Sequence, residues 1–352
     1  MEREQLSLHM NGGKGQRSYA NNSSLQRTII RKTRSILEET ITRLYCDTFP
    51  NNCLKVADLG CSVGSNTLLV TSNIIDIVDN RSTQLNREPP TFQFYLNDLF
   101  GNDFNTIFKS LPGFYERLLE DKGHKFSPCF INATPGSFYG RLFPSNSINL
   151  FHSSYSLHWL SQDPLLRSRE VASLNKGHCH IVSTSPPEFQ QDFKLFLKSR
   201  SEELVPGGAI VLVLLGRNEI PRRNGWELIS LILNDMFLEG LIEEEKLDSF
   251  NIPVYEPTLE EIRHAIQEEG SFVVLRLEIL ILPLDEGLNE GGDDSFLAGN
   301  IKAELIAKHM RAILEPLLST KFGAEVINEL FIRYEKKTMQ LMEVEKLECV
   351  SE

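Results

Sequence analysis

The stretch "KVADLGCSVGSNTLLV", residues 55–70, contains the features that decide the fold. An apolar run ends at the acid Asp58, and the glycines Gly60 and Gly64 follow before the polar Asn66, which suits a helix start. This order is typical of a buried strand, a tight turn and a helix, and such turns often hold a charged ligand. Nucleotides, dinucleotides and S-adenosyl compounds are the candidate ligands.

The spacing within the turn narrows these candidates. A phosphate-binding loop needs the pattern GxxxxGK[ST], and no lysine follows this turn. A dinucleotide fingerprint needs GxGxxG, whereas the chain has only the GxxxG spacing. The remaining pattern, D-x-G-x-x-x-G, is that of a methyltransferase turn, with a plain strand-to-helix turn as the alternative.

A second acid strengthens the methyltransferase interpretation. "TFQFYL", residues 91–96, predicts a buried strand, and Asp98 follows it directly. A carboxylate at this strand end can accept hydrogen bonds from both hydroxyls of a ribose. The alternative is that Asp98 caps a helix begun in "NDLFGNDF".

The rest of the chain predicts an α/β fold with a doubly wound, parallel sheet and a helical cap. Further apolar runs typical of buried strands are "LKVADL" (54–59), "CFINAT" (129–134), "SINLFH" (147–152) and "AIVLVLLG" (209–216). Helices are expected at 24–46, 225–247, 259–270 and 296–345, the last broken near Pro316 and Gly323, and a late strand at 271–283. We therefore expect a Rossmann-like domain over 1–216, a cap segment over 217–270, and a late strand with cap helices over 271–352.

Composition excludes several classes of protein. The chain has 352 residues, 41% of them hydrophobic, and a net charge of -12, which disfavours nucleic acid as a partner. The six cysteines form no CxxC pair, so we expect reduced thiols. The N-terminal residues lack a long apolar run, and the two most apolar stretches are too short to span a bilayer. We expect a cytoplasmic protein with no membrane partner.

The motifs together resemble the SABATH family of plant S-adenosylmethionine-dependent methyltransferases. The matching blocks, in order, are "SYANNSSLQ", "VADLGCSVGSN", "YLNDLFGNDFN", "PGSFYGRLFP", "HSSYSLHWLSQ", "NKG" and "EEEKLDSFNIPVY". The family includes salicylate, benzoate and jasmonate carboxyl methyltransferases and caffeine-pathway N-methyltransferases. The resemblance implies a Rossmann-like methyltransferase domain with a helical cap, and a homodimer.

The resemblance also implies a cofactor site for S-adenosylmethionine. With the turn residues included, the expected cofactor residues are Tyr19, Asp58, Gly60, Cys61, Asn66, Asp98, Leu99, Ser137 and Phe138. Asp98 suits the ribose, and Phe138 offers an aromatic face to the adenine.

An acceptor pocket is implied by the aromatic stretch that follows the fourth strand. Gln26 and Trp159 match the pair that holds the substrate carboxylate in carboxyl-methylating members, and His158 stands where salicylate-specific members often carry Met. The remaining expected pocket residues are Tyr155, Trp226, Met310 and Phe331. Without the resemblance, these aromatic residues would be interpreted as core. A carboxylate is ionised at neutral pH, so we expect positioning residues and no general base, whereas a xanthine nitrogen would need weak help from His158 or Tyr155.

A magnesium ion is a further implication of the resemblance. Asn175, Asp248, Asn251 and the backbone oxygen of Phe250 match positions assigned to Mg²⁺ in some members. The alternative is a helix exit in which the Asp and Asn side chains bond the local backbone.

Three departures from the family pattern leave the function open. Val63 and Ser65 replace the usual residues of the turn, and Ser65 leaves free a dihedral angle that the family's proline fixes, which lowers the expected rigidity of the turn. The segment 187–193 is shorter than usual, and the end "MQLMEVEKLECVSE" lacks the usual apolar final strand. We expect a carboxyl methyltransferase acting on an aromatic or related acid. The alternatives are a purine N-methyltransferase of the caffeine type and a cofactor-binding protein with reduced or lost activity.

Overall fold

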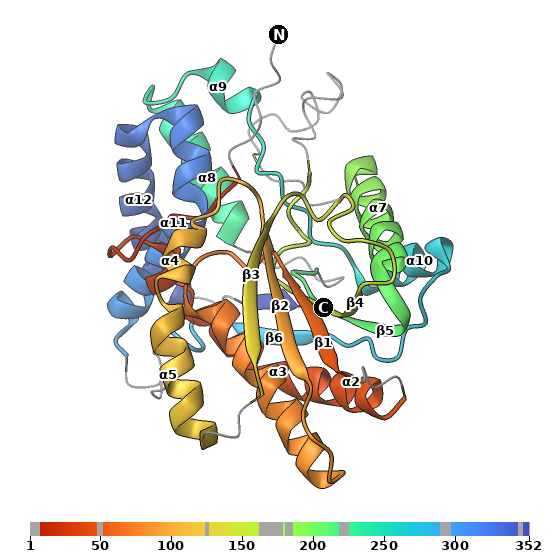
Figure 1. Cartoon of the computed structure of the whole chain (residues 1–352). Coiled ribbons are helices and arrows are strands. Elements are labelled where there is room, and N and C mark those ends of the chain that lie inside the picture. The colour runs from red at the N-terminus through yellow and green to blue at the C-terminus, as the bar shows by residue number, and fades with distance from the viewer. Residues whose placement is uncertain are drawn as a thin grey trace.

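The computed structural model describes residues 8–47, 52–123, 127–161, 179, 186–217, 225–288, 297–343 and 348–351. Its centre is a five-stranded parallel sheet in the order β3-β2-β1-β4-β5 (Figure 1). The strands are β1 (Cys53–Leu59), β2 (Thr91–Asp98), β3 (Cys129–Pro135), β4 (Ile148–Ser154) and β5 (Leu204–Val213). All five strands expected from the apolar runs are present, and the α/β fold class is confirmed.

The strand order reverses between β1 and β4, the point where open α/β sheets bind their ligands. From β1 the chain moves outward to β2 and β3, and it then returns to the other side of β1. The glycine turn, Asp98 and the aromatic stretch all follow the carboxyl ends of these strands. The topology therefore brings them to one edge.

Helices cover both faces of the sheet. On one face lie α2 (Arg34–Asp47), α3 (Ser65–Gln84) and α5 (Leu111–Lys122), preceded by the short α4 (Phe104–Phe108). On the other lie α7 (Pro187–Glu203) and α10 (Leu259–Glu269). Each face has its own apolar core, because the strands carry buried residues on both sides: Phe94 packs toward α3 and Phe151 toward α7.

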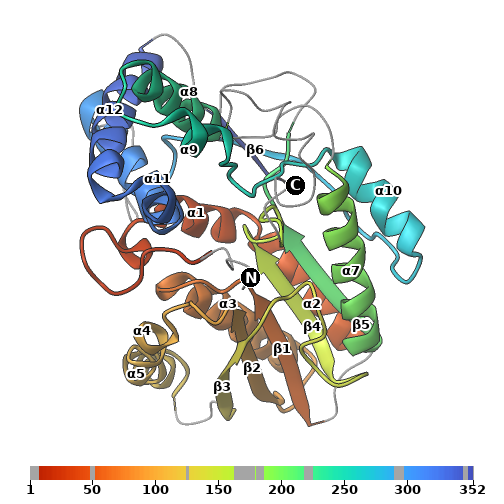
Figure 2. The same cartoon turned by 90° about the horizontal axis from the view of Figure 1, so that it is seen from above.

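A third apolar core belongs to a helical cap over the carboxyl edge of the sheet. It is built by α8 (Gly225–Leu238), α9 (Glu244–Asp248), α11 (Gly299–Phe322) and α12 (Ala324–Met342). In Figure 2 this layer is separated from the sheet by α1 (Ser24–Lys32), which follows a single 3-10 turn, η1 (Tyr19–Asn21). Leu25 and Ile29 of α1 are buried in the cap core, so α1 is tied to the cap.

The predicted helix break at Pro316 is wrong, because α11 continues through it. A proline lacks the N–H that would bond the carbonyl four residues earlier. That carbonyl, Ala312 O, accepts a hydrogen bond from the backbone N–H of Asn11 at 2.9 Å. Residues 8–23 are thereby docked on the cap. The other expected break is confirmed at Gly323, whose φ of 87° ends the helix.

Two strand predictions near the C-terminus need correction. The expected strand 271–283 is reduced to β6 (Leu280–Pro283). The tail expected to lack a strand forms β7 (Glu348–Ser351), antiparallel to β6. Backbone pairing is sufficient for this, and Gly216 N–H also donates to Val350 O at 3.1 Å. No helix in the described part of the chain is both long enough and apolar enough to cross a membrane.

Candidate active site

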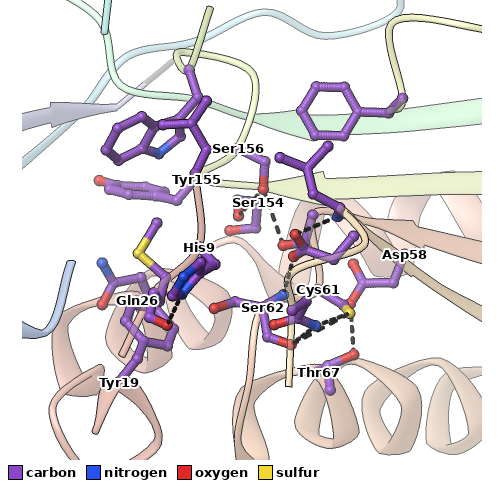
Figure 3. Close-up of a pocket in the computed structure, with 18 of the residues that line it drawn as sticks. His9, Tyr19, Gln26, Asp58, Cys61, Ser62, Thr67, Ser154, Tyr155 and Ser156 are labelled. Atoms are coloured by element: carbon purple, nitrogen blue, oxygen red, sulfur yellow. Dashed lines mark hydrogen bonds between the residues drawn. The ribbon is translucent and has the colours of Figure 1, made fainter. Parts of the chain in front are cut away.

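A cavity of about 1030 Å³ opens at the carboxyl edge of the sheet. Its wall is made by residues 8–10 and Tyr19, α1, the glycine turn, the segments after β2, β3 and β4, and α11. Figure 3 shows Gln26, Tyr19 and Tyr155 on one side of it and Asp58, Cys61 and Thr67 on the other. All nine residues expected to hold the cofactor line this cavity.

The two glycines of the turn are required by close packing. Gly60 has a φ of 74°, and a Cβ placed on it would lie 2.0 Å from the Ser156 hydroxyl. Gly64 has a φ of 114°, and its Cβ would lie 2.8 Å from Ala20 Cα. Positive φ values and these contacts both favour glycine. Protein neighbours, Ser156 at one glycine and Ala20 at the other, therefore require glycine at these two positions.

Asp58 supports the turn from below. Its Oδ2 accepts from the Thr67 hydroxyl at 2.8 Å, and its Oδ1 lies 2.8 Å from His152 Nδ1, which donates to it. Thr67 is on α3 and His152 on β4, so the carboxylate joins three elements beneath the glycines. Because both of its partners are buried side chains of neighbouring elements, Asp58 acts mainly in positioning the turn.

Asp98 is partly buried at the end of β2 and lines the cavity. It accepts hydrogen bonds from the backbone N–H groups of Ser62 at 2.7 Å and Leu99 at 2.8 Å. Burial raises the pKa of Asp98 to about 6, although these two bonds oppose that shift. Ser62 has a φ of 52°, an unfavourable conformation for a residue with a side chain, and the bond to Asp98 holds it there. The helix-cap alternative does not apply, since Asp103 caps α4.

The unusual Ser65 of the turn is held by a side chain from α1. Arg27 Nη2 donates to Ser65 Oγ at 2.7 Å, and Arg27 Nε donates to Asn66 Oδ1 at 3.2 Å. The Asn66 amide donates in turn to the backbone and hydroxyl oxygens of Ser23. These bonds restrain the turn where the family's proline would, and they link the turn to the helix that carries Gln26.

The loop after β3, which carries Ser137 and Phe138, is fixed by a buried ion pair. Arg200 of α7 has no exposed surface and donates to Glu203 at 2.8 Å. Its two remaining nitrogens donate to the backbone oxygens of Phe138 and Gly140, each at 2.8 Å. Glu203 accepts from the Phe143 N–H at 2.9 Å. One guanidinium thus sets the backbone path of the loop.

Three of the expected acceptor residues, Gln26, Tyr155 and Trp159, line the same cavity. Tyr155 has a φ of 60°, which is strained for a bulky residue, and its N–H donates to Val213 O at 2.7 Å. The Trp159 carbonyl accepts from the Tyr139 hydroxyl at 2.6 Å. These two hydrogen bonds therefore fix the backbone at both ends of the segment from Tyr155 to Trp159.

The other four expected acceptor residues stand behind the described wall. Trp226 packs edge-on to Trp159 with ring centroids 5.8 Å apart, and its Nε1–H donates to Glu256 at 3.0 Å. Met310 and Phe331 are buried in the cap core. His158 is buried, accepts from the Leu215 N–H at 3.4 Å, and burial lowers its pKa to about 3. A neutral His158 behind the wall is not placed to take a proton from an acceptor in the described cavity.

The predicted magnesium ligands are only partly described. Asn175 lies outside the described residues. Asp248 ends α9, Phe250 is packed in the cap core against Phe322, and Asn251 is fully buried. Within the described ranges no three His, Cys, Asp or Glu side chains are grouped to hold a metal. Asp248 is the one carboxylate of the expected set, and no step of the chemistry is assigned to the ion.

Several cavity residues were not anticipated from the sequence. His9 and Met10 come from the N-terminal segment, Asn102 follows Asp98, and Ile313 and Leu317 come from α11. Asn102 donates to Ser62 O at 2.9 Å. Its place in "NDLFGND" was a usable signal, whereas the other four are brought in by cap packing that no local pattern reveals.

Similarity to known proteins identifies the family to which this chain belongs. The model of the family described as SAM dependent carboxyl methyltransferase matches residues 5–351. The chain is a member of this family. The SABATH resemblance is confirmed, and the chain is a methyltransferase with S-adenosylmethionine as its methyl donor.

Individual relatives align with this chain over almost its whole length. A probable jasmonic acid carboxyl methyltransferase of Theobroma cacao is 46% identical over 93% of this chain and 91% of its own length. A probable caffeine synthase of Coffea canephora is 41% identical over 95% and 92%. The solved structure of a loganic acid methyltransferase with SAH is 30% identical, covers 97% of this chain and 98% of its own, and has a TM-score of 0.80.

Proposed function

We propose that this methyltransferase acts on the carboxylate of a small aromatic or related acid. The observation that supports this most is that Gln26 and Trp159 share one cavity with Asp98 and the glycine turn. A volume near 1030 Å³ is at the upper end for a single small-molecule site, which leaves room for cofactor and acceptor together.

In this proposal the nine cofactor residues form the cofactor wall, which Tyr19 completes from the side of the cavity that also carries Gln26 (Figure 3). Asp98 accepts from the ribose hydroxyls, Phe138 stacks on the adenine, and Gly60 and Cys61 bring the turn close to the methionine portion. Bound S-adenosylmethionine supplies a sulfonium methyl, whose bond to sulfur breaks as the bond to the acceptor oxygen forms. Tyr19, Asn66, Leu99 and Ser137 complete the cradle.

The chain's own contribution to the chemistry is orientation. A carboxylate acceptor is already ionised, so the protein has no proton to remove. Gln26 and Trp159 hold it, Tyr155 fixes its plane, and Ile313 and Leu317 exclude water. Alignment of the two reactants supplies most of the rate enhancement.

The test is methyl transfer from labelled S-adenosylmethionine to salicylate, benzoate, jasmonate, xanthosine, 7-methylxanthine and theobromine. We expect turnover on an acid, and we expect Gln26→Ala to reduce kcat/KM for that acid far more than for any purine. Gln191→Ala, an exposed glutamine on α7, is the matched control. Equal losses on acids and purines would contradict the carboxylate assignment.

A purine N-methyltransferase is the second candidate, favoured by the 41% identity to the probable caffeine synthase. Turnover on a purine alone would establish it. Cofactor binding without turnover on any acceptor would instead support a protein of reduced activity. The homodimer, the magnesium ion, the cytoplasmic location and the domain boundaries 1–216, 217–270 and 271–352 stay predictions.

A further inference from the structure

Gln26 has an unbalanced hydrogen-bond environment. Its side chain is buried on α1 and lines the cavity. The amide nitrogen lies 3.5 Å from His309 Nε2. The amide oxygen Oε1 is buried and has no hydrogen-bond partner within the described part of the chain. An unpartnered buried oxygen is unfavourable unless a ligand satisfies it.

His309 of α11 determines whether the nitrogen or the oxygen of the Gln26 amide faces the cavity. Its Nδ1 lies 2.8 Å from the backbone oxygen of Asn22, and a carbonyl oxygen can only accept, so Nδ1 carries a proton. Burial lowers the pKa of His309, which keeps the ring neutral. Nε2 therefore has a free lone pair and accepts from the Gln26 amide N–H.

The reverse orientation of the amide is disfavoured by the same geometry. Turning Gln26 over would place Oε1 against the Nε2 lone pair of His309, with no proton between the two acceptors. The orientation shown offers the cavity Oε1 and one remaining N–H, an acceptor beside a donor. A bare carboxylate can use only the N–H and would lie beside the amide oxygen.

We propose that His309 is a positioning residue that fixes the Gln26 amide with its oxygen toward the cavity, and that the enzyme consequently prefers acids bearing a hydrogen-bond donor, a hydroxyl or N–H, near the methylated carboxylate. This inference rests on the proposed function for its substrate class. The orientation of the amide itself does not depend on it.

The substrate test compares hydroxylated benzoates with their methyl ethers and with benzoate. The wild-type enzyme is expected to prefer the best hydroxylated acid over its ether by about tenfold in kcat/KM, the effect of satisfying one buried acceptor. In His309→Leu the amide is free to turn both N–H groups toward the carboxylate, so this ratio falls to about twofold and kcat/KM for benzoate rises.

Two variants separate positioning from a general structural effect. His309→Gln can still accept from the Gln26 amide and is expected to restore much of the preference. His264→Leu changes an exposed histidine of α10 and is expected to leave the ratio unchanged. Because the readout is a ratio of two acceptors on one protein, a uniform loss of stability does not alter it. An unchanged ratio in His309→Leu overturns the proposal.

A measurement that needs no turnover tests the orientation directly. Ring ¹⁵N shifts of His309, assigned by their loss in His309→Leu, should show a protonated Nδ1 and an unprotonated Nε2 near neutral pH. A protonated Nε2 overturns the inference. Failure to methylate any acid, with the Nδ1–H form observed, would contradict the proposed function alone.

Discussion

The cofactor wall and the acceptor wall of the cavity differ in how they are built. All nine residues expected on the cofactor wall line the cavity, whereas three of the seven expected on the acceptor wall do. Cofactor residues mostly follow a strand directly, so the sheet order alone places them. Acceptor residues come from α1, α11 and the segment after β4, whose meeting depends on the cap. The difference teaches that a local motif predicts one wall and tertiary packing decides the other.

The largest expected effect tests how far the cofactor wall depends on buried charge. Arg200→Met removes the closer ion-pair partner of the buried Glu203, whose contact with Arg141 is longer at 3.5 Å, and we expect the unfolding free energy to fall by about 3–5 kcal/mol. Urea denaturation measures this. Arg43→Met, which removes a half-exposed arginine of α2 paired with Glu39, should cost under about 1 kcal/mol. Similar losses in the two variants would mean that the loop does not rely on Arg200.

The glycine turn gives the next largest effect. Gly60→Ala adds a Cβ against Ser156 at positive φ, and we expect a loss of about 2–4 kcal/mol from strain and overpacking. Gly15→Ala has open space and should change stability little. Thermal unfolding with and without S-adenosylhomocysteine measures both stability and binding. An unaffected Gly60→Ala would show that the turn can relax.

Asp98 predicts a pH dependence of cofactor binding. Only the carboxylate accepts well from both ribose hydroxyls, and the pKa of about 6 in the free protein means that affinity falls below that pH, by at most tenfold per unit. The raised pKa also means that ionisation of Asp98 opposes folding of the free protein as pH rises toward 6. Asp98→Asn should bind S-adenosylhomocysteine about 10- to 100-fold more weakly.

Calorimetric titration between pH 5 and 8 distinguishes these outcomes for Asp98. In Asp98→Asn, residue 98 no longer titrates, so its contribution to the pH dependence of S-adenosylhomocysteine affinity should be absent. A wild-type affinity that is constant across the range would remove Asp98 from the ribose contact.

The smallest effect is expected from a substitution in the acceptor wall, which we compare with a substitution behind that wall. Ile313→Val enlarges the cavity and should change the kcat/KM ratio of two acids differing by one methyl several-fold. Met310→Leu, a volume-conserving change in the cap core, should change that ratio by less than about twofold. A larger effect at Met310 would place it in direct contact with the acceptor.

The local sequence predicted the sheet well because each strand is a continuous apolar run that is followed by polar residues. The same logic placed Asp98 and the glycine turn. It failed at Pro316, where a proline inside an apolar helix was interpreted as a break, because the partner that accommodates it lies some 300 residues away in the chain. It also failed for the tail, since backbone pairing of β6 and β7 needs little hydrophobicity.

Site details were less predictable where they depend on hydrogen-bond partners far apart in the sequence. Gln26 was expected in the acceptor wall, but its contact with His309 is set by the docking of α1 on α11. Ser65 was interpreted as a loss of rigidity, whereas Arg27 restores it. In both cases the residue type was visible and its partner was not.

The hydrogen bond from the Asn11 N–H to the Ala312 carbonyl allows the docking of the N-terminal segment to be followed by hydrogen exchange. The Asn11 amide hydrogen is protected from exchange with solvent only while residues 8–23 lie on α11, since its acceptor belongs to the cap. Its exchange rate therefore measures how often this segment lifts off, separately from global unfolding. Exchange that slows when S-adenosylhomocysteine binds would show that the segment closes over an occupied cavity, with His9 and Met10 moving as part of it.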